Sequence, residues 1–192
     1  MKRLLLPATL FLALTGALLR AAPLQLGAAA PVVTATAETG KPLDLAAVYQ
    51  GSKYTLVYFY PKAFTSGCTT QGCALRDSYD ELTKKGVTVI GVSADDADTQ
   101  KKFKEEYKFP FSLIADTDKK VMKAFGQAGL NMASREAYLI KDGKVVYHDT
   151  NQTGSQAQNI LNFLSRESAA PATAPAPATK PADAKPAAPA AK

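Results

Sequence analysis

Cysteine, histidine and tryptophan are scarce in this chain of 192 residues, which has two cysteines, one histidine and no tryptophan. A structural zinc site takes about four cysteine or histidine ligands, so two cysteines and His148 are too few to build one. We therefore expect no metal site, and we expect His148 to lie in a strand or hairpin with no special role. Any thiol chemistry of this chain depends on Cys68 and Cys73.

Net charge of one sign is nearly absent from the middle of the chain. The formal net charge is +6, of which residues 1–22 contribute +3 and residues 169–192 contribute +2, leaving +1 for residues 23–168. A nearly neutral segment without basic residues interleaved with aromatics argues against nucleic acid as a partner.

An apolar run of the length of a membrane span, roughly 18 residues or more, is also missing. The predominantly apolar residues 4–19 are shorter and follow Lys2 and Arg3. We interpret residues 1–22 as a secretory signal, with an uncleaved N-terminal anchor as the alternative. Both interpretations predict an exported, periplasmic protein. No cysteine lies directly after the apolar run, so we expect no lipoprotein anchor.

Large apolar side chains are missing from residues 169–192, which are almost entirely alanine, proline and lysine. Such a segment cannot bury enough surface to offset the conformational entropy lost on ordering. We expect a disordered tail with partly polyproline-like conformation, and a tether to the cell wall or to a partner is the functional alternative. Residues 23–168 then form a single domain with a substantial core.

Within this domain, strand-like and helix-like segments alternate. We predict strands at 54–60, 87–94 and 111–116, helices at 66–85, 96–108, 119–126 and 155–167, a hairpin at 136–149 that turns at Asp142-Gly143, and loose strands or a hairpin at 31–50. This alternation predicts an α/β domain in which a parallel or mixed central sheet is covered by helices on both faces.

The two cysteines lie in the helix that is expected directly after the first buried strand. In open α/β sheets, functional sites lie beyond the carboxyl ends of strands, so Cys68 is where a reactive group is expected. Five residues along a helix separate two Cα atoms by roughly 8 to 9 Å, whereas a disulfide spans about 4.4 to 6.8 Å. Cys68 and Cys73 can therefore be bridged only after the helix opens, and Gly67 and Gly72 lower the free energy needed for that opening.

Several kinds of thiol chemistry remain open on these observations alone. An exported chain with two cysteines could form an ordinary structural disulfide, although an intact helix prevents it. A thioredoxin-like thiol–disulfide exchanger would use C-x-x-C, not C-x4-C. A copper chaperone would need a nearby histidine, and only His148 is present. A thiol peroxidase would hold the Cys68 thiolate at the helix N-terminus and use a second thiol to trap the sulfenic acid.

The segment YFYPKAFTSGCTTQGCALRDSYDEL closely resembles the peroxiredoxins of the bacterioferritin-comigratory (Q) type. The active-site pattern of that family, P-x-x-x-T-x-x-C, is matched by Pro61, Thr65 and Cys68. Its resolving cysteine is matched by Cys73. In the family a late strand begins R-x-x-[FY]-L-I, and REAYLI supplies that arginine as Arg135.

The resemblance covers most of residues 23–168 and implies a thioredoxin-like (peroxiredoxin) fold. It implies an atypical 2-Cys enzyme that reduces hydrogen peroxide and organic hydroperoxides for antioxidant defence, without metal, haem or flavin. A thioredoxin-like electron donor would re-reduce it, and a monomer is expected because the resolving cysteine is in the same chain. The family usually has proline where this chain has Ser66, which leaves the turn before Cys68 less rigid. The stretch between Gly126 and Arg135 is short compared with many members, which leaves open the peroxide specificity and any partner surface there.

The resemblance also implies a role for each matched residue. Cys68 is the peroxidatic cysteine, and Cys73 resolves its sulfenic acid as an intrachain disulfide. Thr65 orients the peroxide through its hydroxyl, and Pro61 shields the sulfur from water. Arg135 stabilises the thiolate and the charge on the departing oxygen. The alternatives are that Thr65 only caps the helix and that Arg135 is an ordinary surface arginine.

Overall fold

The computed structural model describes residues 22–127, 132–150 and 154–169. The predicted signal or anchor and the predicted tail lie outside the described residues, except for Ala22 and Ala169. Along the chain the elements are β1 (Thr34–Thr36), β2 (Pro42–Asp44), α1 (Leu45–Gly51), β3 (Tyr54–Phe59), α2 (Ser66–Asp77), α3 (Tyr79–Lys84), β4 (Val87–Ser93), α4 (Ala97–Tyr107), β5 (Ser112–Ala115), α5 (Lys120–Ala124), β6 (Glu136–Lys141), β7 (Lys144–Thr150) and α6 (Gln156–Ala169).

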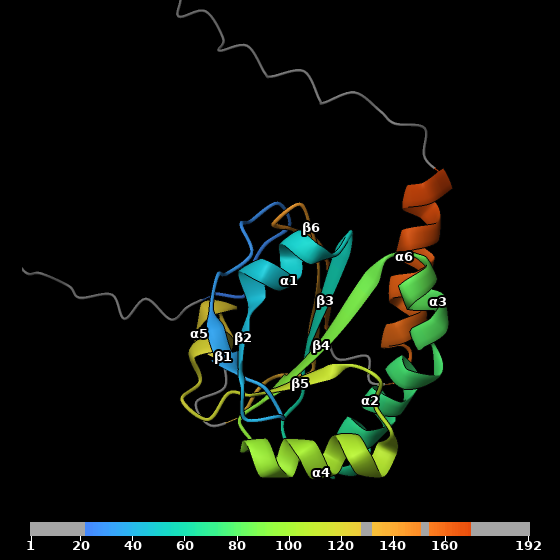
Figure 1. Cartoon of the computed structure of the whole chain (residues 1–192). Helices are drawn as coiled ribbons and strands as arrows, with labels where there is room; N and C mark the ends of the chain where they lie inside the picture. The colour runs from blue at the N-terminus through green and yellow to red at the C-terminus, as the bar shows by residue number, and fades with distance from the viewer. Residues whose placement is uncertain (1–21, 128–131, 151–153, 170–192) are drawn as a thin grey trace, which may run out of the picture.

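The main sheet has five strands in the order β5-β4-β3-β6-β7 (Figure 1). Strands β3, β4 and β5 run parallel, whereas β6 pairs antiparallel with β3 and β7 pairs antiparallel with β6. The central strand β3 carries no charge and is buried along its whole length, as a strand covered on both faces requires. Its carboxyl end is followed by a loop, residues 60–65, and then by α2, which carries both cysteines.

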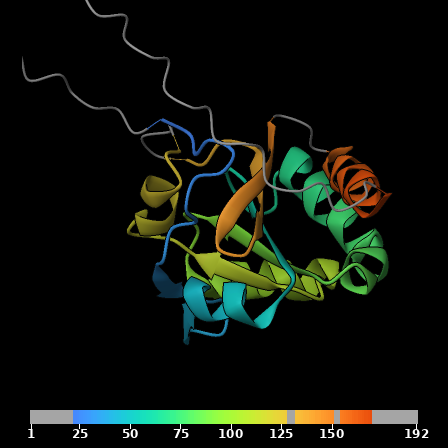
Figure 2. The same ribbon diagram turned by 90° about the horizontal axis from the view of Figure 1, so that it is seen from above.

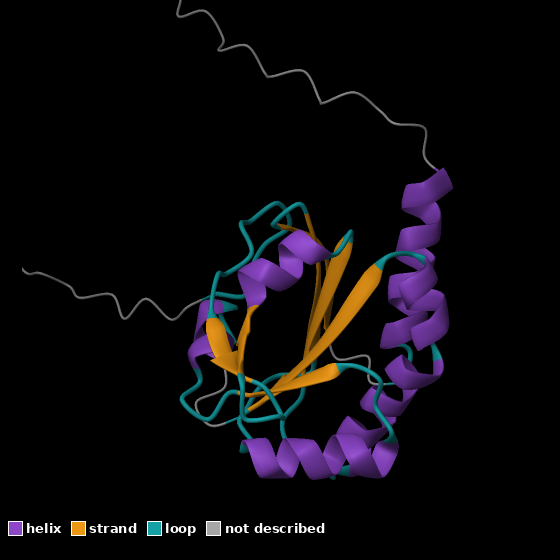
Figure 3. Cartoon of the chain, viewed as in Figure 1, coloured by secondary structure: helices purple, strands orange, loops and turns teal. Residues whose placement is uncertain are grey.

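Helices cover both faces of this sheet, as Figures 2 and 3 show. One core cluster joins the sheet to side chains of α2, α3, α4 and α6, and it includes Cys68. The other cluster joins the opposite face to α1 and α5. Among the residues that the structure describes, no helix is long and apolar enough to cross a bilayer. The predicted α/β architecture, with a mixed sheet and helices on both faces, is confirmed.

Two predictions about local structure need correction. The single helix predicted over 66–85 is divided at Ser78, whose backbone has φ −96° and ψ 3°. Serine competes for backbone hydrogen bonds, and so favours such breaks over helix interiors. The segment 31–50 contains the expected hairpin, but it ends in the unpredicted helix α1. Its start is fixed by Asp44, whose Oδ1 accepts a hydrogen bond from the backbone N–H of Ala46 at 3.0 Å.

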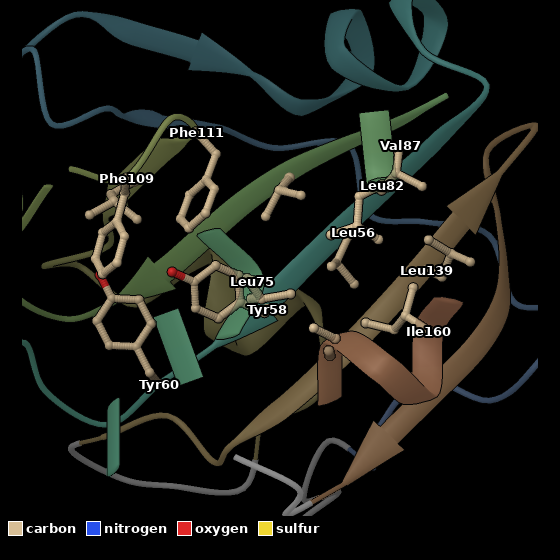
Figure 4. Close-up of a cluster of buried hydrophobic side chains, with 14 of the residues drawn as sticks. Leu56, Tyr58, Tyr60, Leu75, Leu82, Val87, Phe109, Phe111, Leu139 and Ile160 are labelled. Carbon is tan, nitrogen blue, oxygen red and sulfur yellow. The ribbon is translucent and has the colours of Figure 1, made fainter. Parts of the chain in front are cut away.

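The core beside α2 is divided into an aromatic part and an aliphatic part (Figure 4). Tyr58, Tyr60, Phe109 and Phe111 gather on one side of the close-up, with Leu75 beside Tyr58. The other side holds aliphatic side chains, namely Leu56, Leu82, Val87, Leu139 and Ile160. The aromatic part lies at the carboxyl end of β3, where α2 begins. Stacked and edge-on rings therefore belong to the same core cluster as Cys68, and Cys73 packs against this cluster.

Candidate active site

Both cysteines lie in the single helix α2, and both are free thiols. Cys68 is in the first turn, where the backbone N–H groups have no partner within the helix and the helix dipole favours negative charge. Its side chain is only 1 % exposed and belongs to the core. Cys73 is partly buried and packs against the same core. The two thiols are therefore unbonded and lie five residues apart on an intact helix. This is the geometry from which we predicted that the helix must open before a disulfide can form.

Arg135 is brought to Cys68 across a long stretch of chain. It directly precedes β6, and its Nη2 donates a hydrogen bond to the Cys68 Sγ at 3.8 Å. Side chains alternate along a strand, so Arg135 points to the same face as Ala137 and Leu139, which share the core cluster of Cys68. The Arg135 Nε is buried and has no hydrogen-bond partner among the described residues. The guanidinium can therefore pair with a thiolate through Nη2, and its buried Nε–H remains an unused donor in the part of the chain that the structure describes.

Gly67 makes this approach possible. A Cβ atom at position 67 would lie 2.7 Å from Arg135 Nη2 and 3.1 Å from its Cζ. Because real contacts of this kind are not that short, any side chain at 67 displaces the guanidinium from the sulfur. The sequence suggested only that Gly67 eases helix opening, and the close approach could not be inferred from a chain position 68 residues away from Arg135.

Thr65 and Pro61 lie in the loop between β3 and α2, close to Cys68 in sequence. Thr65 is the N-cap of α2 by its backbone conformation, but its side chain makes no capping hydrogen bond. Its exposed hydroxyl instead donates to the carbonyl of Lys62 at 3.0 Å, which leaves the oxygen lone pairs able to accept. Pro61 is partly buried. Neither residue is hydrogen-bonded to Cys68 in the described part of the chain, in contrast to Arg135.

The same loop is held by a hydrogen-bond network that the sequence did not reveal. The backbone N–H of Ala63 donates to Asp95 Oδ2 at 2.8 Å, and the Ser93 hydroxyl donates to the same oxygen at 2.7 Å. Gln100 Nε2 donates to the Ser93 Oγ at 2.7 Å, and the Tyr60 hydroxyl donates to Gln100 Oε1. The end of β4 and the start of α4 thereby fix the path of the chain into α2.

Phe64 is strained in this loop. Its φ is +63°, which is rare for a bulky residue, and such conformations persist only where the surroundings hold them. Its ring packs against Phe103 and Tyr107, with centroids 5.1 and 6.3 Å away, yet the residue is 46 % exposed. The partly exposed aromatic ring of Phe64 therefore lies four residues before Cys68 in the sequence.

Two tyrosines of β3 and its end complete the surroundings of the thiols. Burial raises the pKa of Tyr58 well above its usual value, and negative charge on Tyr60, Cys68 or Cys73 would raise it further. Burial likewise raises the pKa of Tyr60, against the lowering effect of its hydrogen bonds to Ser93 and Gln100. Both phenols therefore stay neutral at physiological pH and add no negative charge beside Cys68.

The comparisons with known proteins agree with this geometry. A sequence model described as the AhpC/TSA family matches residues 26–148. The chain belongs to the AhpC/TSA family. Peroxiredoxin Bcp of Escherichia coli strain K12 is 38 % identical over 152 residues, which cover 74 % of this chain and 96 % of that protein. The predicted resemblance to the Q-type peroxiredoxins is confirmed.

Two further members of this group extend the comparison. The chloroplastic peroxiredoxin Q of Oryza sativa subsp. japonica is 43 % identical over 130 residues, and the match covers 66 % of this chain and 59 % of the rice protein. The chain thus spans about three fifths of the rice relative. The solved structure of the Xanthomonas campestris bacterioferritin comigratory protein superposes with a TM-score of 0.65 at 25 % identity, covering 73 % and 99 % of the two chains. The thioredoxin-like peroxiredoxin fold is confirmed.

In this member of the family, a buried polar cluster supports the backbone around Arg135. Gln127 Oε1 accepts a hydrogen bond from the N–H of Ser134 at 2.9 Å, and Gln127 Nε2 donates to Glu136 Oε2 at 3.1 Å. His148 lies in β7, within the predicted hairpin, and its Nε2 is 3.0 Å from the same carboxylate oxygen. The residues on both sides of Arg135 are thereby fixed. Residues 128–131 lie outside the described part of the chain.

Proposed function

We propose that the protein is a thiol-dependent peroxidase that reduces hydrogen peroxide and organic hydroperoxides. The observation that carries the proposal is the contact of 3.8 Å between Arg135 Nη2 and the buried sulfur of Cys68 in the first turn of α2. A cation and a helix N-terminus at one sulfur both favour its thiolate form. Alkyl peroxide reduction is the activity described for the Xanthomonas campestris relative, which supports the substrate class.

In the proposed first step, the Cys68 thiolate attacks the nearer oxygen of the peroxide and the O–O bond breaks. The sulfur is oxidised to a sulfenic acid, and the departing oxygen leaves as an alkoxide or hydroxide that takes a proton from water. Arg135 stabilises the thiolate and the developing charge on the departing oxygen. Thr65 has acceptor capacity to orient the peroxide, and Pro61 would limit the access of water to the sulfur.

In the proposed second step, α2 opens and the Cys73 thiol attacks the sulfenic sulfur of Cys68. A disulfide forms within the chain and one water molecule leaves. An intact α2 does not allow this disulfide, because the Cα atoms of Cys68 and Cys73 are then about 8 to 9 Å apart, too far for a disulfide to span. A dithiol donor of the thioredoxin kind would then reduce the disulfide and close the cycle.

The wider setting is part of the same proposal. Residues 1–22 act as a secretory signal or anchor, so the enzyme works in the periplasm. It works there as a monomer, because its resolving cysteine lies in the same chain, and residues 169–192 are a solvated tail. In that oxidising compartment the reductant must be supplied by a dedicated donor protein, since thiols are not maintained there by a glutathione pool.

The test is a titration of the reduced protein with hydrogen peroxide, read by free-thiol content and intact mass. We expect both thiols to disappear with the loss of two hydrogen atoms, much faster than free cysteine reacts. Cys68→Ser should abolish turnover, and Cys73→Ser should allow one turnover and then accumulate the sulfenic acid. Undiminished peroxidase activity in Cys68→Ser would refute the proposal. Oxidation at the rate of free cysteine, with rapid reduction of insulin, would instead indicate a disulfide exchanger.

A further inference from the structure

Gln71 connects the cysteine-bearing helix to two other elements of the fold. It lies in α2 between Cys68 and Cys73, and its side chain is completely buried. Its Nε2 donates one hydrogen bond to the carbonyl of Phe59, at the end of β3, at 3.2 Å. The same nitrogen donates a second bond to Oε1 of Gln156, the first residue of α6, at 2.9 Å. The amide therefore ties the middle of α2 to the sheet and to a neighbouring helix.

This buried pair of amides is only half satisfied. Gln156 is also completely buried, and neither the Gln71 Oε1 nor the Gln156 Nε2 has a hydrogen-bond partner among the described residues. A buried polar atom without a partner destabilises the state that buries it, whereas water can satisfy the same atom once it is exposed. The closed helix therefore gains two hydrogen bonds from the pair and loses the hydration of two other polar atoms.

Because of the position of Gln71, its hydrogen bonds and its unpaired oxygen affect the free energy of the helix opening that disulfide formation requires. Cys68 and Cys73 are five residues apart, so the turn that contains Gln71 has to unwind before the two sulfurs can meet. Unwinding that turn withdraws Gln71 from both Phe59 and Gln156. Gly72, next to Gln71, already weakens the helix at this point, because glycine is a poor helix former.

We propose that the Gln71–Gln156 pair is a latch that sets how often α2 opens and therefore how fast Cys73 resolves the oxidised Cys68. Gln71 is a positioning residue in this inference, since it touches neither the peroxide nor the reacting sulfurs. The inference rests on the proposed peroxidase function and adds a determinant of its second step. A weak latch lets the sulfenic acid be trapped before a second peroxide converts it to the irreversible sulfinic acid.

The test is a double-mutant cycle with Gln71→Met, Gln156→Met and the double variant, because methionine keeps the length of glutamine without its amide. Gln71→Met removes the donor of both hydrogen bonds in the closed state, whereas Gln156→Met removes one acceptor and leaves the bond from Gln71 to the Phe59 carbonyl. Opening and disulfide formation should therefore accelerate, about tenfold for Gln71→Met and less for Gln156→Met. In the double variant both amides are gone, and disulfide formation should be slower than in Gln71→Met alone. This reversal is expected of coupled residues and not of two independent structural ones.

Two rate constants have to be measured separately. Quenched-flow samples after a single pulse of hydrogen peroxide, analysed by intact mass, give the loss of the Cys68 thiol and the later appearance of the disulfide. The rate of loss of the Cys68 thiol should stay within about twofold of the parent in all variants. The rate of disulfide formation should rise in the single variants and be lower in the double variant than in Gln71→Met. Thr70→Ala is the matched control, since among the described residues the exposed Thr70 hydroxyl bonds only the Ser66 carbonyl of its own helix, and it should leave both rates near those of the parent.

The possible failures are distinguishable. If the parent thiol reacts no faster than free cysteine, the proposed function fails, and amide hydrogen exchange of α2 still tests the latch by its rate in Gln71→Met. If the parent forms its disulfide rapidly but the variants match its rate, or their effects simply add, the latch is wrong and the peroxidase proposal stands.

Discussion

The dipeptide Gly-Cys occurs twice in α2, five residues apart, and its two copies have different surroundings. At the first copy, a Cβ atom on Gly67 would meet the guanidinium of Arg135 at 2.7 Å. At the second copy, a Cβ atom on Gly72 would meet the ring of Phe109 at 2.6 Å. Each glycine admits a large neighbour, but one neighbour is a cation and the other is an aromatic hydrocarbon.

This difference supports the separate tasks that we propose for the two cysteines. Cys68 lies in the first turn of α2, and its sulfur accepts a hydrogen bond from the Arg135 guanidinium, so a positive charge and a helix N-terminus meet at this sulfur. Cys73 follows a glycine on which an aromatic ring packs, and that ring anchors the helix by apolar contact. The two thiols are the same chemical group, so the proposal that Cys68 reacts with peroxide first depends on this difference between their neighbours.

The largest effect is expected from removing the cation at the first copy. Arg135→Met keeps most of the side-chain volume and deletes the charge, so the rate constant for Cys68 with hydrogen peroxide should fall by about 10²-fold, the usual effect of losing one preorganised donor. The measurement is the pseudo-first-order loss of the Cys68 thiol in a Cys73→Ser background.

The matched control for Arg135→Met is Arg76→Met, near the second copy. The Arg76 guanidinium is paired with Asp77 and with the carbonyl of Tyr107, away from the chemistry proposed for Cys68. This variant should react with peroxide at nearly the parent rate. An equal loss in both arginine variants would mean that the general positive charge of the region matters, and not the contact between Arg135 and the sulfur.

The next effect comes from adding one methyl group at each copy. Gly67→Ala pushes against the flexible end of Arg135, so the peroxide rate should fall by about tenfold, while helix propensity leaves the free energy of unfolding unchanged or up to about 1 kcal/mol higher. Gly72→Ala pushes against the ring of Phe109, which is 3 % exposed, so the protein should lose about 1 to 3 kcal/mol of stability.

Urea unfolding and the peroxide rate, measured on both variants, test this contrast. Gly72→Ala should react with peroxide at close to the parent rate as long as it is folded. If Gly67→Ala were destabilised and fully active, and Gly72→Ala stable and slow, the roles assigned to the two neighbours would be exchanged.

The sequence predicted the architecture well because each strong strand and helix has a local signature. The uncharged run at 54–60 predicted the buried centre of the sheet, and Asp142-Gly143 predicted a hairpin turn whose two residues have φ of +50° and +69°. The break at Ser78 was missed because one serine among helix-forming residues gives a weak signal. Helix α1 was missed because its seven residues are too short to show a period.

The site was predictable only in part, and for a physical reason. The motif around Cys68 and the arginine of REAYLI could be matched, and the structure brings Cys68 and Arg135 into contact. Contacts between distant segments leave no local pattern, so the approach of Arg135 to Gly67 and the pairing of Gln71 with Gln156 could not be read from the chain. The support of Ala63 by Asp95 was hidden for the same reason.

The smallest effect is expected far from both Gly-Cys copies, at Glu167, whose carboxylate accepts hydrogen bonds from Lys141 and Tyr54. Partial burial raises the pKa of Glu167, but hydrogen bonds from Lys141 and Tyr54 outweigh it and hold the pKa below its ordinary value of 4.5. A carboxylate with a lowered pKa in the folded state stabilises the fold above the unfolded value, and this contribution is lost as the pH falls through the folded value. Glu167→Gln should therefore cost about 0.5 to 1 kcal/mol near pH 7 and almost nothing near pH 3.

Urea unfolding of the parent and of Glu167→Gln at the two pH values measures this difference, and the peroxide rate of the variant should equal that of the parent. A stability difference that persists unchanged in acid would mean that Glu167 acts by packing and not by charge. A slower reaction with peroxide would mean that the end of α6 at Glu167 is coupled to its other end, where Gln156 bonds Gln71 of α2. The reactivity of Cys68 would then depend on residues beyond the immediate neighbours of the two Gly-Cys copies.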